Sequence, residues 1–215
     1  MASSLNIKSY NLASLLVFFI SVTLSGCSST NSPPLLPIIK QSQSERILAL
    51  TAMPFWKIKG KIAFVESGSR NSANLVWQIN NDQNSQRLNL TSYLGISVLK
   101  LESNNNLHTL TVDGNIHKSD DLNGLIYSLT GLTLPTNALQ FWLKGLSYQQ
   151  SDVVIYNDIT NLPETLLSQY QSQTWQVKYR DYRQFGPFSL PTKISIYQDA
   201  LVIKVVINHW FIPAN

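Results

Sequence analysis

The chain contains a single cysteine, Cys27, whose position suits one particular modification. It follows an apolar stretch at residues 12–24, and the tetrapeptide Leu24-Ser25-Gly26-Cys27 matches the bacterial lipobox. In that motif small residues admit the signal peptidase, and the thiol is alkylated with diacylglycerol. We therefore expect Cys27 to be the lipid-modified first residue of the mature chain. The alternative is a free thiol behind an ordinary signal peptide.

Residues 1–26 have the pattern of a lipoprotein signal peptide, because Lys8 precedes an apolar stretch shorter than the ~20 residues of a transmembrane helix. Residues 27–42 are rich in Ser, Asn and Pro and are expected to form an acylated flexible tether. Residues 43–215 are expected to form one domain. Because Ser28 rather than aspartate follows the cysteine, lipoprotein sorting rules imply an outer-membrane location facing the periplasm.

The three histidines, His108, His117 and His209, show none of the spacings of a metal site. His117 precedes the pair Asp120-Asp121, which permits an acid–base or ligand cluster. The more common interpretation is that the two acids favour a helix start and that the imidazole is solvated. No metal ion or other cofactor is expected.

Glu66 and Glu102 are a candidate glycosidase pair, although carboxylates at strand ends usually face solvent. The sequence contains no G-x-S-x-G elbow, P-loop or G-x-G-x-x-G motif, so we expect no enzymatic activity. The net charge of +4 comes from scattered cations, except for Lys57, Lys59 and Lys61 on one face of a strand. Nucleic-acid binding is not expected, whereas attraction to anionic lipid or an acidic partner remains open.

The composition, 44% hydrophobic and 13% charged, excludes a disordered tail or a coiled coil. Polar and apolar residues alternate from Trp56 to Phe64, which is typical of a strand with one wet face. Further strands are predicted at residues 73–79, 88–90, 98–100, 110–112, 153–156, 175–179, 193–197 and 201–210. Turn-forming clusters separate the segments, so we expect a mainly β (α+β) fold with one curved antiparallel sheet of about ten strands.

Three helices are also expected, and two of them follow the middle of the sheet. The first covers residues 43–53. The second begins at the cap Ser119 with Asp120-Asp121 in its first turn, and the third lies between Pro135 and Gly145. The second helix has one apolar stripe, formed by Leu122, Leu125, Ile126 and Leu129. The latter two helices are placed to cover a concave face of the sheet.

Two sets of hydrophobic residues have two interpretations each. The turn Thr91–Ile96 presents Tyr93, Leu94 and Ile96 where polar residues are usual. Leu94 either folds back onto the core or belongs to an exposed apolar tip that enters a bilayer or a partner's groove. The five tryptophans all fall in predicted elements, where they either pack the core, the more common outcome, or line a cavity.

The order of several short motifs resembles the LolB family of outer-membrane lipoprotein receptors. The motifs are Gly60-Lys61-Ile62-Ala63, Ala73 with Trp77, Leu94-Gly95, Leu134-Pro135 with Leu139, Trp142-Leu143-Lys144-Gly145, Trp175-Gln176-Val177-Lys178-Tyr179, Leu190-Pro191, and Ile203-Lys204-Val205-Val206-Ile207 with Trp210. The family usually has proline and a small polar residue where this chain has Tyr93 and Ile96.

The resemblance implies an incomplete antiparallel β-barrel of about ten to eleven strands whose helices cover a hydrophobic cavity. It implies that the protein accepts lipoproteins from the periplasmic carrier LolA and inserts them in the outer membrane. Its ligands are then the acyl chains of client lipoproteins and outer-membrane phospholipid, and a monomer is expected. The loop Tyr93, Leu94, Gly95 and Ile96 takes the membrane-insertion role.

The candidate cavity lining comes from the inward faces of the strands and from the helices. It consists of Ile58, Ile62, Phe64, Leu75, Trp77, Leu88, Leu90, Leu125, Ile126, Leu129, Trp142, Trp175 and Val177. Two other functions remain open: a lipid-anchored envelope assembly scaffold with a filled core and no acyl-binding cavity, and an enzyme acting on wall or lipid.

Overall fold

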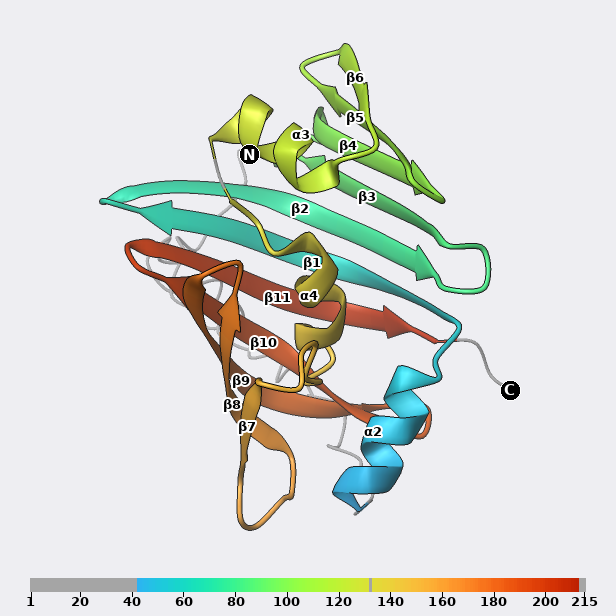
Figure 1. The fold of residues 1–215 in the computed structure, drawn as a ribbon, viewed down its shortest axis with the longest axis vertical. Helices are drawn as coiled ribbons and strands as arrows, with labels where there is room; N and C mark the ends of the chain where they lie inside the picture. Colours follow the sequence, from blue (N-terminus) through green and yellow to red (C-terminus); the bar gives the residue numbers. More distant parts are fainter. Residues whose placement is uncertain (1–41, 132, 213–215) are drawn as a thin grey trace, which may run out of the picture. The chain divides into compact units, whose positions relative to one another are not determined.

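The computed structural model describes residues 42–131 and 133–212 (Figure 1), which contain one antiparallel sheet of 11 strands and three helices. The helices are α2 (Gln43–Thr51), α3 (Leu122–Thr130) and α4 (Thr136–Trp142). The strands are β1 (Phe55–Glu66), β2 (Ser69–Asn80), β3 (Ser85–Thr91), β4 (Ser97–Asn104), β5 (Leu107–Val112), β6 (Asn115–Ser119), β7 (Val153–Tyr156), β8 (Pro163–Tyr170), β9 (Gln173–Phe185), β10 (Phe188–Gln198) and β11 (Leu201–Phe211). No helix within these ranges has the length and apolar composition needed to cross a bilayer. The predicted leader (1–26), Cys27 and residues 28–41 of the tether lie outside the described residues.

The sheet follows the order β6-β5-β4-β3-β2-β1-β11-β10-β9-β8-β7, so the first and last strands pair in its middle. Its two edges, β6 and β7, are consecutive in sequence and are joined by residues 120–152. Because the edges lie at opposite ends of an open sheet, this connection has to cross one face, and it carries α3 and α4 over that face (Figure 1). We call the covered side the inner face and the other side the outer face. The predicted curved sheet with helices is confirmed.

The predicted start of α3 is wrong. Its N-cap is Asp121, whose Oδ1 accepts a hydrogen bond from the backbone N–H of Gly124 at 3.0 Å, and no acidic residue lies in the first turn, so Asp120 is outside it. Ser119 is instead the last residue of β6, and its Oγ accepts from the Asp121 N–H at 3.0 Å. The reason is that β6 pairs with β5 as far as Ser119, so the helix can begin only after this residue.

Gly60 allows β1 and β11 to approach each other at an irregularity in their pairing. Lys59 lies opposite His209 whereas Gly60 lies opposite Ile207, so one residue of β11 is extra at this point. A Cβ atom on residue 60 would lie 2.0 Å from the Val206 carbonyl oxygen. A side chain there would therefore force the central strand pair apart.

Two separate hydrophobic clusters form on the inner face. The larger one includes the fully buried Trp56, Trp142 and Trp175; the ring centroids of Trp142 and Trp175 are 5.9 Å apart. The smaller one joins α3 to β4 and β5 and consists of Leu101, Leu110, Leu122 and Ile126. Because α4 packs on the larger cluster and α3 on the smaller one, the two helices hold different parts of the sheet.

Two buried cations attach α4 to α2. Arg46 in α2 donates from Nη2 to the Lys144 carbonyl at 2.6 Å and from Nη1 to the Gly145 carbonyl at 3.4 Å. Lys144 donates in return from Nζ to the carbonyl of Leu50 at 2.8 Å. Both side chains are only 3% exposed, and burial lowers the pKa of Lys144 to about 8. The bond from Lys144 satisfies a carbonyl in the last turn of α2, and those from Arg46 satisfy carbonyls in the turn that follows α4.

Candidate functional site

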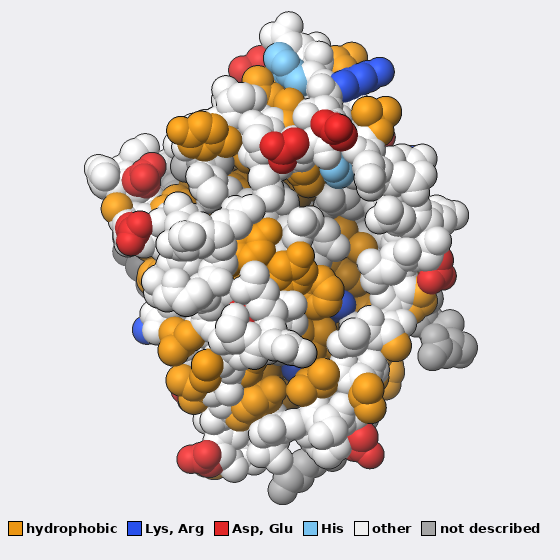
Figure 2. Space-filling model, viewed as in Figure 1, with side chains coloured by type: hydrophobic (Ala, Val, Ile, Leu, Met, Phe, Trp, Pro, Cys, Tyr) orange, Lys and Arg blue, Asp and Glu red, His pale blue; other side chains and the backbone are white. Residues whose placement is uncertain are grey.

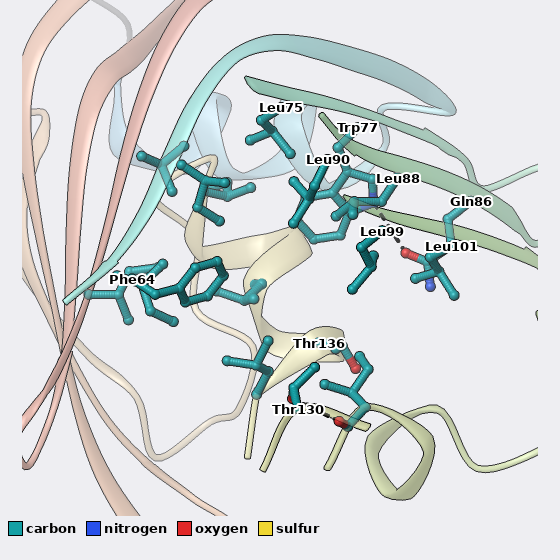
Figure 3. A pocket seen from close by; sticks show the side chains of 18 of the residues that line it. Phe64, Leu75, Trp77, Gln86, Leu88, Leu90, Leu99, Leu101, Thr130 and Thr136 are labelled. Carbon is teal, nitrogen blue, oxygen red and sulfur yellow. Dashed lines mark hydrogen bonds between the residues drawn. The ribbon is translucent and has the colours of Figure 1, made fainter. Parts of the chain in front are cut away.

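An apolar hollow of about 330 Å³ lies between the inner face of the sheet and the helices α3 and α4 (Figure 3). It is lined by Ile62, Phe64, Asn71, Leu75, Trp77, Gln86, Leu88, Leu90, Leu99, Leu101, Leu110, Ile126, Thr130, Leu134, Thr136, Leu139, Leu143, Ile196, Ile203 and Val205. These residues come from seven strands, both helices and the segments that follow each helix, so the sheet has to curve around one space. The volume is at the lower end of the ~300–1,000 Å³ typical of small-molecule pockets.

The polar residues of the lining are mostly engaged within the protein. The Gln86 side-chain oxygen accepts from Trp77 Nε1 at 3.2 Å, and Thr136 Oγ1 donates to Asn123 Oδ1 at 2.7 Å. Thr130 Oγ1 donates to the Ile126 carbonyl at 2.8 Å. The remaining lining, apart from the exposed Asn71, is hydrophobic. Such a surface favours an apolar ligand, because a polar one would lose its hydrogen bonds to water without replacement.

The hollow exists because the two hydrophobic clusters do not merge. Leu101 and Ile126 of the smaller cluster line one side of it, and Trp77 and Ile203 of the larger cluster line another. Only partly buried residues such as Leu88 pack against both clusters. On the helix-covered side, hydrophobic side chains gather around a depression in the middle of the molecular surface (Figure 2). An apolar space of this kind suits hydrocarbon better than water.

Seven of the thirteen candidate lining residues border the hollow. They are Ile62, Phe64, Leu75, Trp77, Leu88, Leu90 and Ile126. The other six do not border this hollow: Ile58, Leu125, Leu129, Trp142, Trp175 and Val177.

These six residues fall in, or pack against, the two hydrophobic clusters. Ile58, Trp142, Trp175 and Val177 are at most 1% exposed and belong to the larger cluster beneath α4. Leu125 and Leu129 pack against the smaller cluster. Period-two alternation identifies which face of the sheet a residue is on, but not whether a helix fills the space above it.

The candidate lining omitted residues on two strands, β11 and β4, for different reasons. Ile203 and Val205 belong to β11, which lies next to β1 only because the ends of the sheet region pair. Leu99 and Leu101 alternate along β4 in the same way as Leu88 and Leu90 along β3. This alternation was the signal that identifies the β4 pair.

The loop between β3 and β4 holds its apolar side chains in solvent. Tyr93 is 92% exposed, Leu94 82% and Ile96 66%. The loop is a defined turn, since the Ser92 N–H donates to the Ile96 carbonyl at 2.8 Å and the Gly95 N–H donates to the Ser92 carbonyl at 3.0 Å. Gly95 has φ +81°, which favours glycine. The turn therefore presents Leu94 outward, and the interpretation that Leu94 folds back onto the core is wrong.

The glutamates and histidines considered for chemistry lie on different strands, Glu66 on β1, Glu102 on β4, His108 on β5, His117 on β6 and His209 on β11. Glu102 lies 2.8 Å from the Lys100 ammonium on the exterior and belongs to a different hairpin from Glu66. The His108 ring nitrogen Nδ1 lies 2.8 Å from Ser103 Oγ, and burial lowers the pKa of His108. Within residues 42–131 and 133–212, no three His, Cys, Asp or Glu side chains are grouped to hold a metal ion.

Comparison with known proteins gives a consistent set of relatives. The family model for outer membrane lipoprotein LolB matches residues 54–210. Outer-membrane lipoprotein LolB of Aeromonas salmonicida is 32% identical over 87% of this chain and 90% of its own length. The protein of the same name from Vibrio cholerae is 31% identical over 93% of each chain.

Two solved structures share the fold at very low sequence identity. A putative outer membrane lipoprotein-sorting protein domain from Vibrio parahaemolyticus aligns with a TM-score of 0.54 at 6% identity, over 80% of this chain and 91% of its own. A LolA superfamily protein from Nitrosomonas europaea aligns with a TM-score of 0.52 at 7% identity, over 81% and 95%. At these identities the likeness concerns the fold alone.

Proposed function

The chain belongs to the LolB family of outer-membrane lipoproteins, and from this we propose that it is a lipid-anchored receptor for other lipoproteins. It accepts the acyl chains of a client from a periplasmic carrier of the LolA type into the hollow. It then releases the client into the outer membrane. The observation that carries this proposal is the apolar hollow of about 330 Å³ between the sheet and helices α3 and α4.

The transfer needs no catalytic group. Acyl chains leave one apolar site and enter another, so their burial in the hollow offsets the free energy of removing them from the carrier. Each tenfold preference for the receiving site requires only ~1.4 kcal/mol. A scaffold with a filled core is less well supported, because the space that such a core would occupy is open.

Cys27 is the proposed site of the anchor. A thiol carrying diacylglycerol, with a further acyl group on the amino terminus, holds the protein on one membrane because each buried CH₂ contributes ~0.8 kcal/mol. The outward-facing loop Tyr93–Ile96 is the proposed contact with the bilayer that receives the client, and the 82% exposure of Leu94 supports this role.

Client transfer tests the proposal. The chain from residue 27 onward carrying Cys27→Ala, here called the anchor-free chain, retains both hydrophobic clusters. Mixed with a carrier loaded with an acylated client, it is expected to acquire the client and to elute with it. Retention of the client by the carrier at every ratio of the two proteins would contradict receptor function. A client stripped of its acyl chains is the control and should not transfer.

A further inference from the structure

The outer face of the sheet is rich in cations that the proposed transfer does not use. On five adjacent strands of the sheet, β2, β1, β11, β10 and β9, the basic residues are Lys57, Lys59, Lys61, Arg70, Lys178, Arg180, Arg183, Lys193 and Lys204, whereas the acidic ones are Glu66 and Asp181. Along β1 the lysines alternate with the buried Trp56 and Ile58 and therefore point to the outer face. The helix-covered side, in contrast, displays few Lys or Arg side chains (Figure 2).

Three of these cations line a shallow cleft next to the exposed loop. Lys61, Arg70 and Lys204 share it with the loop residue Tyr93 and with Asn74. We call this site the basic cleft; its remaining lining is Ile62, Ala63, Ser72, Ala73 and Val206, and its volume is about 330 Å³. Pairing across the strands brings it together, since Lys61 lies opposite Asn74 on β2 and Ala63 lies opposite Lys204 on β11.

The loop is fixed to the cleft by a hydrogen bond. Asn74 Nδ2 donates to the Ser92 carbonyl at 3.0 Å, so the first residues of the turn are held against β2. Tyr93 belongs to both features, because it is 92% exposed at the tip and also lines the basic cleft. The apolar tip and the three cations therefore form one continuous surface.

The charges of the basic cleft are not compensated by the protein. In the described part of the chain, none of Lys61, Arg70 and Lys204 lies within ion-pair distance of a carboxylate, whereas Lys193 on the same face pairs with Asp181 at 2.5 Å. Cations beside an apolar tip complement a bilayer surface, where hydrocarbon lies just below a layer of phosphate groups. The long stems of Lys and Arg reach such phosphates while the tip occupies the acyl boundary.

We propose that the basic cleft binds the phosphate groups of anionic phospholipids at the bilayer surface, beside the point where Leu94 enters. This rests on the proposed function in one respect, namely that the loop meets the membrane. The cleft adds an orientation: with Lys61, Arg70 and Lys204 on the headgroups, β1, β2 and β11 meet the bilayer by the ends nearest the loop. An acidic protein surface is the other class of partner that the charge would fit, and the experiment separates the two.

The test is vesicle binding by the anchor-free chain, with phosphatidylcholine vesicles that contain or lack phosphatidylglycerol. We expect the triple variant Lys61→Gln, Arg70→Gln, Lys204→Gln to lose roughly 100-fold in affinity for the anionic vesicles. The matched control is Lys57→Gln, Lys178→Gln, Arg180→Gln, which removes the same charge from the same face outside the cleft. It should lose less than roughly tenfold. Unchanged thermal unfolding of both triple variants verifies the fold.

Three outcomes overturn the proposal. An equal loss of vesicle affinity in the two triple variants would mean that anionic lipid is attracted to the whole outer face rather than to the cleft. No loss in either variant would mean that this face does not contact lipid. If the cleft variant binds vesicles normally but no longer receives client from the carrier, the cleft binds a protein rather than lipid. Leu94→Glu is measured in parallel to keep the two proposals apart. Unimpaired client delivery by that variant would contradict the role of the loop in the proposed function. The comparison of the two triple variants would still test whether the cleft binds phospholipid.

Discussion

Leu94 combines an apolar side chain with 82% exposure in a well-defined turn. Truncating a buried leucine to alanine lowers the free energy of unfolding by ~2–5 kcal/mol, whereas truncating an exposed one changes it by only about 0.5 kcal/mol. We expect Leu94→Ala and Leu94→Glu to leave the melting temperature nearly unchanged. Both variants should accept client from the carrier, but delivery to liposomes should fail, most severely for glutamate, since its charge must be desolvated at the lipid interface.

The matched control is Leu48→Glu, which places the same charge on another exposed leucine, 71% accessible in α2. Delivery by this variant should equal that of the unmodified protein. A large loss of stability in Leu94→Ala would show that the side chain packs elsewhere in the folded protein. Normal delivery by Leu94→Glu would refute the role of the loop.

Lys144 makes stability depend on pH. Burial lowers its pKa from 10.5 to about 8, so between these values the unfolded chain binds more protons than the folded one, and stability rises with pH. We expect the free energy of unfolding to increase by about 1–2 kcal/mol between about pH 7.5 and 9.5, measured by urea titration. Burial raises the pKa of Tyr179 and Tyr182, and this reverses the trend above the ordinary tyrosine pKa of 10.0.

Lys144→Met is the comparison for this pH dependence, because it keeps an unbranched side chain and removes the titration. Its stability should vary less than that of the unmodified protein over the same interval. Parallel curves for the two proteins would contradict the assignment of the proton to Lys144.

At the scale of elements, the attachment of α2 to α4 depends on Arg46. Replacing it with methionine leaves the carbonyls of Lys144 and Gly145 without their buried donor. We expect Arg46→Met to lower the free energy of unfolding by about 2–3 kcal/mol in a denaturant titration. Arg87→Met, whose side chain is 75% exposed beside Glu102, is the control and should change it by no more than about 0.5 kcal/mol. Equal effects of the two substitutions would refute this role of Arg46.

The elements could be predicted where their hydrophobic periodicity is strong. β1 and the second half of β2 alternate clearly, and α2 carries the capping box of Ser42 and Glu45 in front of its apolar residues.

Strands β6 and β8 were missed for different reasons. β6 is a short edge strand with Ile116 65% exposed, and β8 begins at Pro163, which usually argues against a strand. Edge strands bury little, so their sequences are weakly constrained.

The order of the strands is a property of the whole molecule and could not be predicted from local patterns. β1 and β11 are separated by almost the entire domain, yet they pair in the centre of the sheet and place Ile203 and Val205 on the hollow. The hollow was predicted in outline, because an inward face and two covering helices were visible in the sequence. The exact set of residues around the hollow was not predicted. Whether Trp142 packs the core or lines the hollow depends on how closely α4 approaches Trp175.

The most direct test of the account is whether the hollow takes up an acyl chain. Binding of a fluorescent fatty acid to the anchor-free chain should be saturable. Leu99→Trp, which adds volume inside the hollow, should weaken it by roughly tenfold or more. Leu107→Trp makes the same exchange at a residue that is 55% exposed outside the hollow, and it should leave binding unchanged. Absence of saturable uptake by the unmodified protein, or equal uptake by a folded Leu99→Trp variant, would contradict the acyl-binding hollow.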